Sequence, residues 1–552
     1  MSVAARIAGP DLHETSVAPR SRSRMLALVI ALAFAAVGGQ LVRLAWQNED
    51  ASTIRVSMMS SPANTLARPD IVDRNGRLLA TDVQMPSLYA DPLLIQDADE
   101  AAERLVRLFP QIDVRELRQS LADKSRRFVW VRRGLSPAMA QRVHNLGIPG
   151  LLFVDEIRRT YPAGRLGGHI LGRVDIDNRG TGGIERYIDE IGASEAAVGA
   201  RLSARAPVRL SLDLGVMHAL DEELAGAMVR YEAAGAAGLV MDVLTGEVVA
   251  SVSRPGVDPA VYEDALDPSR IDRIAAGTYE LGSIMKLVTV AMALEMGRSL
   301  DSMVDTAEPL KAGRFTIEDL HPLGRPMSVS EVFIHSSNVG AGQLALSAGA
   351  ATQKAFLQKL GLWSALKTEV SSGPAPQKPQ QIGRIEQITL SFGHGLATTP
   401  LQFAAASAAL MNGGTRVTPT FMALDGEAPV VRGERVVSAR TSALLREVMR
   451  RNVTDPAGTG RRADVPGFEV GGKTGTAEMA AKGGYRKKSI LASFIGTFPS
   501  SEPRYVTLIL LFEPKGQDVT GGEITAGRNA APTTARIIER IAPLLGVPAK
   551  SL

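Results

Sequence analysis

The sequence predicts an α+β protein with more than one folded domain and a single N-terminal transmembrane helix. Its 552 residues are more than one hydrophobic core usually organises. A long apolar stretch lies near the N-terminus. In the C-terminal half, strand-like runs come both early and late, with helical segments between them. One sheet built from both ends of that half accounts for this order.

The composition excludes several functional classes. The chain has no cysteine, which rules out a disulfide framework, a thiol nucleophile and a cysteine metal site. The formal net charge is +4 without a long block of Lys and Arg, so the sequence does not indicate nucleic-acid binding. The 7 histidines are scattered, with no metal-binding pair at helical spacing. We expect them to be structural or at the surface.

The segment 25–46 predicts the transmembrane helix. Up to Val42 its only polar side chain is Gln40, and Trp46 lies where the outer interface is expected. Arginines directly precede the segment, and basic residues stay on the cytoplasmic side of a membrane. We therefore expect a disordered cytoplasmic tail at 1–24 and a folded part outside the cytoplasm.

A cleaved signal peptide is the alternative interpretation of this segment. Signal peptides also begin with basic residues, but their apolar stretch is usually shorter and ends in a small-residue cleavage site. Arg43 and Trp46 fit such a site poorly. We therefore expect an anchor that is retained in the mature protein.

The region 48–205 predicts a mixed domain without catalytic residues. Residues 70–77 have the pattern of a strand that runs into an Asn-Gly hairpin turn. Apolar residues recur at helical spacing over 99–121, which predicts a helix there. Dense glycines over 164–183 indicate loops. Because no nucleophile and base come together in this region, we expect a structural or docking role.

The region 206–552 predicts the α+β unit. Apolar residues repeat every four positions over 216–228, which indicates an amphipathic helix. The expected strands are 238–243, 247–252, 470–478, 490–498 and 505–512, and the further expected helices are 283–295, 401–411 and 531–545. A central antiparallel sheet with strands from both ends of the region follows from this order.

Ser283 and Lys286 form the first of three short motifs that can carry chemistry. Ser283 lies at a predicted helix start, where backbone N–H groups are unpaired and the helix dipole is positive. Lys286 follows on the same helix face. Desolvation or a neighbouring cation lowers the pKa of a lysine, so that its amine can take the serine proton. The pair predicts a nucleophile with its general base.

Ser336 and Asn338 form the second motif. The hydroxyl of Ser336 can relay a proton between the Lys286 amine and a leaving nitrogen. Asn338 can hold Lys286 or a substrate amide by hydrogen bonds. Taken alone, Ser-Ser-Asn is a frequent loop or cap tripeptide, so its assignment depends on the other two motifs.

The third motif, Lys473, Thr474, Gly475 and Thr476, lies in a predicted strand. Lys473 is a candidate for the cation beside the lysine base, and it can attract a substrate carboxylate that the two threonine hydroxyls can bond. Gly475 lets a peptide substrate approach the strand edge closely. The N–H groups of Thr476 and Ser283 are candidates for an oxyanion hole.

The third motif also resembles a phosphate-binding loop. That signature requires a glycine, four residues, and then Gly-Lys-Ser/Thr. The run Gly467–Thr474 has this spacing, but the residues around Gly467 do not have the pattern of a strand that runs into a loop. We therefore do not expect nucleotide binding.

In this order the three motifs are typical of penicillin-binding proteins and class A β-lactamases. The chain after residue 60 resembles class B penicillin-binding proteins, the monofunctional transpeptidases that cross-link bacterial peptidoglycan. The further segments that carry the resemblance are Arg68–Gly76, Arg159–Pro162, Gly180–Glu185, Leu210–Asp213, Met241–Glu247 and Thr399–Gln402. Leu281 stands where the family usually has Pro, and Pro69 where it usually has Gly.

The resemblance implies the architecture of the exported part. A non-catalytic, elongated pedestal domain of the dimerisation type is expected at 48–205. A transpeptidase domain like that of serine D,D-peptidases and β-lactamases is expected at 206–552. The family fold is a five-stranded antiparallel sheet with flanking helices and a helical subdomain. The single anchor at 25–46 implies the inner (cytoplasmic) membrane, with the catalytic domain in the periplasm.

The resemblance also implies the reaction. Ser283 is expected to attack the D-Ala-D-Ala end of a lipid-linked stem peptide, and β-lactams are expected to acylate the same serine. No cofactor and no metal is implied. The segment 525–532 looks like the division-specific FtsI type, with the elongation type as the runner-up. A SEDS glycosyltransferase of the FtsW type and other divisome membrane proteins are the implied partners.

Three other functions fit the sequence less well. A class A β-lactamase deacylates with a glutamate-held water, and no Glu-x-x-Leu-Asn segment lies between Asn338 and Lys473. A non-catalytic divisome scaffold has no need of the three intact motifs. A penicillin-sensing receptor normally needs more membrane spans and a cytoplasmic output domain, which the tail 1–24 does not offer.

Overall fold

The computed structural model describes residues 68–197, 206–424, 433–481 and 484–550, together with part of the segment 25–40. Two compact units divide the chain, residues 1–66 and 67–552. The strands and helices that follow all belong to the second unit.

The predicted N-terminal anchor is only partly covered by the described residues. The tail 1–24 lies outside them, as do several positions of the segment 25–46. The described positions of that segment, which include 34–40, are helical. No helix within the described part of the chain is long and apolar enough to cross a membrane.

The first sheet of the second unit is built around the long strand β2 (Leu78–Ala90). The predicted hairpin is confirmed, because β1 (Ile71–Val72) turns back antiparallel onto β2. Farther along, β2 pairs with both β3 (Val129–Arg132) and β4 (Leu151–Thr160). Leucines of β2 and of the neighbouring helices bury a separate small core here, which includes Leu88, Leu105, Leu117 and Leu121.

The helical spacing over 99–121 is confirmed, and two helices form there. The first, α2 (Ala98–Leu108), ends directly before Phe109 and Pro110, and a proline cannot donate the hydrogen bond that would continue a helix. The second, α3 (Val114–Ala122), begins at Asp113, whose carboxylate accepts two backbone N–H groups of its first turn. Both helices bury leucines on one face, so helical spacing persists across the break.

Buried ion pairs tie β2 and β4 to the helix α6 (Gly183–Ala197). Arg159, whose side chain is completely buried, lies 2.7 Å from Glu185 and 3.2 Å from Asp82. Arg68 reaches the second oxygen of Glu185 at 2.9 Å. We call these four residues the arginine cluster. The cluster lies beside the glycine-rich stretch 164–183, which forms turns and the short helix α5 (Gly168–Leu171).

The second sheet has five antiparallel strands in the order β14-β15-β16-β6-β7. Their bounds are β6 (Gly235–Asp242), β7 (Val248–Arg254), β14 (Gly471–Ala481), β15 (Gly484–Phe498) and β16 (Tyr505–Phe512). The expected antiparallel sheet is confirmed, since β16 from the late half pairs directly with β6 from the early half. β14 lies at one edge of the sheet.

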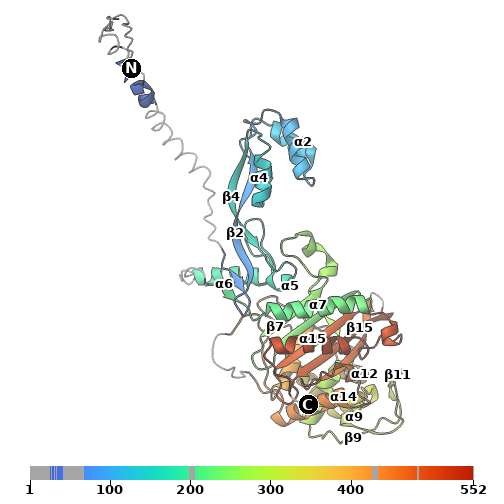
Figure 1. The fold of residues 1–552 in the computed structure, drawn as a ribbon. Coiled ribbons are helices and arrows are strands. Elements are labelled where there is room, and N and C mark those ends of the chain that lie inside the picture. Colours follow the sequence, from blue (N-terminus) through green and yellow to red (C-terminus); the bar gives the residue numbers. More distant parts are fainter. Residues whose placement is uncertain are drawn as a thin grey trace, which may run out of the picture. The chain divides into compact units, whose positions relative to one another are not determined.

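Helices from the two ends of this region pack together on the sheet. The helices α7 (Leu214–Arg230) and α15 (Ala530–Leu544) contact each other and the strands beneath them (Figure 1). Ile537, Ile538 and Ile541 of α15 are fully buried, as the spacing of apolar residues predicted.

A helical block lies between the early and late strands. Its central helix, α8 (Lys286–Glu295), is buried along nearly its whole length, which explains why its sequence is apolar on every face. Around it stand α9 (Val329–Ile334), α10 (Asn338–Ala348), α11 (Ala350–Lys359), α12 (Arg384–Ser391), α13 (Pro400–Met411) and α14 (Ala439–Thr454).

Hydrogen bonds join the first sheet to the second region. β1 pairs in parallel with β5 (Val208–Arg209), the short strand that leads into α7. Asn75 in the hairpin turn donates a hydrogen bond of 2.8 Å to Asp213, which caps α7. Arg74 lies 3.2 Å from Glu247, next to the turn between β6 and β7.

Candidate active site

Ser283 lies in a 3₁₀ turn, η3 (Gly282–Met285), that leads directly into α8. Side chains three residues apart stack over one another in such a turn. The Nζ atom of Lys286 is accordingly 2.9 Å from the Oγ atom of Ser283. The first predicted pair is therefore within hydrogen-bonding distance, with the amine completely buried behind the hydroxyl.

The second motif closes around the same amine. Lys286 Nζ lies 2.7 Å from Asn338 Oδ1, 3.1 Å from Ser336 Oγ and 2.7 Å from the carbonyl oxygen of Ser336. Ser336 has φ 58°, a left-handed conformation that costs a non-glycine residue free energy and is common at functional sites. Between these two residues, Ser337 turns away and caps α10 by accepting the N–H of Gly340.

Lys473 of the third motif is also completely buried. Its Nζ atom lies 5.8 Å from the centre of the Phe333 ring and donates to the Thr474 carbonyl at 3.1 Å. Burial lowers the pKa of Lys473 to about 7. The pKa of Lys286 is held well below its usual value, first by burial and then by the charge of Lys473. Lys473 therefore has the electrostatic effect that the sequence suggested.

The amine of Lys473 is buried in the structure. Its attraction of a substrate carboxylate therefore stays a prediction. The side chain of Thr474 is nearly buried as well, whereas Thr476 is exposed and accepts a hydrogen bond from the N–H of Ala526 at 3.2 Å. The hydroxyl of Thr476 is thus the group of this motif at the surface.

Gly475 serves the packing of the serine. A Cβ atom at this position would lie 2.5 Å from the carbonyl oxygen of Leu281 and would also collide with the hydroxyl of Ser493. The glycine therefore lets the chain just before Ser283 lie directly against β14. This is a different reason for glycine from the predicted approach of a peptide substrate.

Asp319 is a residue of the site that the sequence analysis missed. It lies in the loop between β11 (Phe315–Ile317) and β12 (Met327–Ser328), and its carboxylate accepts hydrogen bonds from Ser337, Asn338 and Val339. Its negative charge raises the pKa of Lys286, against the effects of burial and Lys473. No spacing pattern in the sequence connects this loop residue with the motifs.

His394 lies closer to the site than a structural histidine was expected to lie. Burial lowers its pKa, the charge of Lys286 lowers it further, and Glu280 and Glu478 act in the opposite direction. The N–H of Gly395 donates to the Glu280 carboxylate at 2.8 Å, which holds the loop beside the strand that precedes Ser283. In the sequence, the glycines on either side of His394 were the signal that could have identified this loop.

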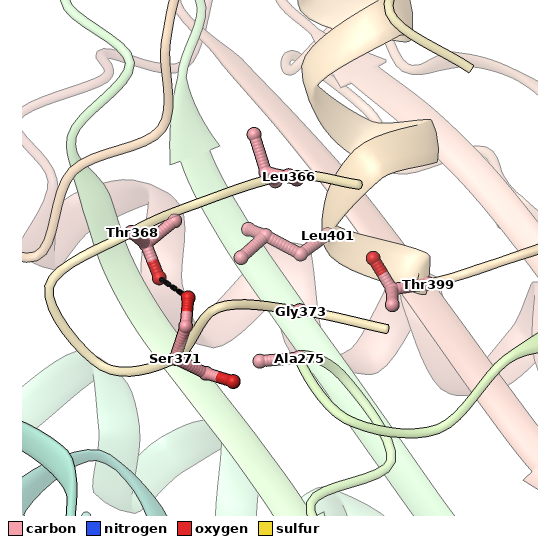
Figure 2. A pocket seen from close by; sticks show the side chains of 7 residues that line it. All are labelled: Ala275, Leu366, Thr368, Ser371, Gly373, Thr399 and Leu401. Carbon is pink, nitrogen blue, oxygen red and sulfur yellow. Dashed lines mark hydrogen bonds between the residues drawn. The ribbon is translucent and has the colours of Figure 1, made fainter. Parts of the chain in front are cut away.

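A small pocket elsewhere in the domain has no part in this arrangement. It is lined by Ala275, Leu366, Thr368, Ser371, Gly373, Thr399 and Leu401, as Figure 2 shows, and has no room for even a water molecule. Among these residues, Thr368 donates a hydrogen bond of 3.3 Å to the Ser371 carbonyl. None of the predicted site residues lines it, so the candidate site remains the edge of β14 beside Ser283.

The arrangement defines a serine acyltransferase of the penicillin-binding type, and comparisons with known proteins agree. Residues 236–539 match the family described as the penicillin-binding protein transpeptidase domain, and residues 64–191 match the penicillin-binding protein dimerisation domain. The chain belongs to the penicillin-binding protein transpeptidase family.

Particular relatives cover most of the chain. A protein of Caulobacter vibrioides named "Probable peptidoglycan D,D-transpeptidase FtsI" is 40% identical over 88% of this chain and 82% of its own length. FtsI of Escherichia coli, a peptidoglycan D,D-transpeptidase, is 28% identical over 90% of this chain and 88% of its own. The apo transpeptidase domain of Burkholderia pseudomallei penicillin-binding protein 3 has a TM-score of 0.55 and 30% identity, over 62% of this chain and 98% of that one.

Proposed function

We propose that the protein is a peptidoglycan D,D-transpeptidase that cross-links stem peptides during septal cell-wall synthesis. One observation carries the proposal. The buried amine of Lys286 lies within 3.1 Å of Ser283, Ser336 and Asn338 oxygens, with a second buried lysine beside it. This is the environment in which a lysine loses its proton and activates a serine.

The first half of the reaction forms an acyl-enzyme. Neutral Lys286 takes the proton of Ser283 as the serine oxygen attacks the penultimate D-Ala carbonyl. The N–H groups of Ser283 and Thr476 receive the developing oxyanion, and each such donor typically contributes about 10²–10³ in rate. Ser336 passes the proton from Lys286 to the nitrogen of the departing D-Ala, which leaves as the free amino acid.

The second half transfers the acyl group to another stem peptide. Its amine attacks the acyl carbonyl carbon, and Lys286 takes the proton that the nitrogen loses. The bond between this carbon and Ser283 Oγ then breaks, and Lys286 returns the proton to the serine oxygen. A β-lactam enters the same first step, but its opened ring stays attached to the acyl group, so the serine remains blocked. Lys473 lowers the pKa of the base Lys286, and Thr474, Gly475 and Thr476 line the substrate edge of β14.

The architecture of the full chain is part of the proposal. We assign a cytoplasmic tail to 1–24, a transmembrane helix to 25–46, a pedestal to 48–205 and the transpeptidase domain to 206–552. The apolar stretch and the preceding arginines support the membrane assignment, with the catalytic domain in the periplasm. A glycosyltransferase of the FtsW type and other divisome membrane proteins are the proposed partners.

Two other functions remain as outcomes of a test. The septal role is favoured over the elongation role because relatives that cover most of the chain are named FtsI.

A membrane-anchored β-lactamase has the same three motifs, but it releases the opened antibiotic quickly. A labelled penicillin that stays attached for many minutes supports the transpeptidase, and rapid release identifies a hydrolase.

The decisive experiment is labelling of the purified protein with a fluorescent penicillin, followed by mass spectrometry of the modified peptide. We expect the label on Ser283. The Ser283→Ala variant should fold normally and take no label. Ser299→Ala, which changes an exposed serine in the same domain, serves as the matched control and should label like the parent. Label retained by Ser283→Ala would refute the nucleophile.

A further inference from the structure

We propose that Asp319 is a positioning residue that holds the Ser336–Asn338 segment against the Lys286 amine. The inference rests on the proposed function, because it concerns the geometry of the same acylation step. Asp319 does not touch the serine nucleophile. It acts through residues that do touch the amine.

The contacts of Asp319 are concentrated on one short stretch. Its Oδ2 atom accepts the Ser337 hydroxyl at 2.6 Å. Its Oδ1 atom accepts the N–H of Asn338 at 2.5 Å and that of Val339 at 3.0 Å. One carboxylate therefore binds three consecutive residues at the start of α10, where N–H groups have no partner within the helix.

This stretch is held from two opposite sides. Lys286 binds the Ser336 carbonyl oxygen and Asn338 Oδ1, and Asp319 binds the backbone of the residues that follow Ser336. A serine in a left-handed conformation persists only where its surroundings determine it from several directions. Asp319 supplies one of those directions, and without it the segment can relax away from the amine.

A helix cap alone does not account for the residue. Ser337 already caps α10 through its hydroxyl, which accepts the N–H of Gly340 at 2.8 Å. The adjacent Glu318 carbonyl oxygen also faces Asn338, at 3.4 Å from its Nδ2 atom. The loop before β12 thus contacts both the backbone and the side chain of Asn338, the residue that binds Lys286.

The charge of Asp319 gives a second, independent readout. Lys286 is influenced by Lys473 from β14 and by Asp319 from this loop, and it acts in turn on His394 from the loop after α12. Asp319 favours the protonated amine, whereas Lys473 disfavours it. Removal of the carboxylate charge therefore lowers the pKa of Lys286, and the acidic limb of the acylation rate moves to lower pH.

The test compares the rate constant for acylation by a fluorescent penicillin across pH 5 to 9 in the full-length protein. Asp319→Ala removes the three hydrogen bonds and should lower the rate about 10- to 100-fold, because small displacements of catalytic groups have effects of this size. Asp319→Asn keeps a carbonyl acceptor and should recover part of the rate, with its acidic limb at lower pH. Asp305→Asn, at an exposed residue whose carboxylate also accepts a backbone N–H, is the matched control.

The outcomes separate this inference from the proposed function. Failure of the parent protein to label on Ser283 overturns the function itself. A labelled parent with Asp319→Ala and Asp319→Asn variants of parental rate and pH profile overturns only the role of Asp319. If these variants do not fold, Ser337→Asp decides, since its carboxylate can still accept the N–H of Gly340 and cap α10 but cannot donate a hydrogen bond to Asp319. A several-fold slower acylation supports the proposal, and a parental rate refutes it.

Discussion

The molecule buries positive charge in two places and does so in opposite ways. In the arginine cluster, Arg159 and Arg68 meet carboxylates within 3.2 Å. In the candidate site, Lys286 and Lys473 are equally buried, and no carboxylate of the described residues forms an ion pair with either. The cluster neutralises its cations, whereas the site leaves the lysines to lose protons. The difference separates charge that stabilises a fold from charge that is prepared for chemistry.

The largest expected effect comes from removing the base. Lys286→Met should lower the rate of penicillin acylation by about 10²–10⁴, the usual contribution of a general base. Stability should change little, because the loss of a desolvated amine offsets the cost of leaving the Ser336 carbonyl and Asn338 Oδ1 without their donor. Acylation kinetics and urea denaturation measure the two quantities. Lys311→Met, at an exposed lysine, is the control, and an active Lys286→Met enzyme would contradict the mechanism.

The arginine cluster should respond in the opposite way. Arg159→Met leaves Glu185 and Asp82 with less compensation in a buried place, so it should destabilise the protein by about 3–5 kcal/mol. The fraction that remains folded should still be acylated at the parental rate. Denaturation followed by circular dichroism measures the change in the free energy of unfolding. A stable variant with impaired acylation would show that the two regions do not differ as we infer.

The pH dependence of stability reports how strongly the Lys473 amine is desolvated. The pKa of Lys473 is about 7 in the folded protein, below its ordinary value of 10.5, so the unfolded chain binds more protons between these pH values. Stability contributed by this residue therefore rises as the pH increases from about 7 towards 10. Subtracting the Lys473→Met curve from the parental curve isolates this slope. A flat difference would mean that the amine is not desolvated.

The smallest effect is expected from an exposed ion cluster. Arg540 on α15 lies 3.0 Å from Glu223 and also pairs with Glu222, but its side chain is 39% exposed. Exposed pairs contribute about 0–1 kcal/mol, because water screens the charges and the long side chains lose freedom. Arg540→Ala should change the denaturation midpoint little and acylation not at all. A loss of stability as large as that of Arg159→Met would show that burial does not decide how much an ion pair contributes to stability.

Much of the fold and the centre of the site could be predicted from the sequence. Continuous apolar runs predicted the central strands of the second sheet, because β6 and β16 are buried at every position. Helical spacing predicted α7 and α15, because each of them buries one apolar face. The contact between Ser283 and Lys286 was predictable, because two residues three positions apart in a helical turn lie on the same face. The helix break at Pro110 has a sequence signal as well, because a proline cannot donate the hydrogen bond that continues a helix.

Other features depend on contacts that no local pattern encodes. Asp319 reaches Ser337 and Asn338 across a loop, and an isolated aspartate in a loop has no period or spacing that identifies its partner. The burial of Lys473 depends on the helical block that covers β14, whereas its sequence context suggests an open edge. Sequence patterns gave residue identities here, and the tertiary packing decided which way each side chain faces.

The close fit around Ser283 limits how the site can change over time. Gly475 has the Leu281 carbonyl where a side chain would begin, and a Cβ atom on Gly393 would collide with the backbone of Gly282. Even an alanine at either position would displace the turn that carries the serine. We therefore expect that variants selected by antibiotics for poorer drug binding will retain both glycines and alter the outer wall of the site instead.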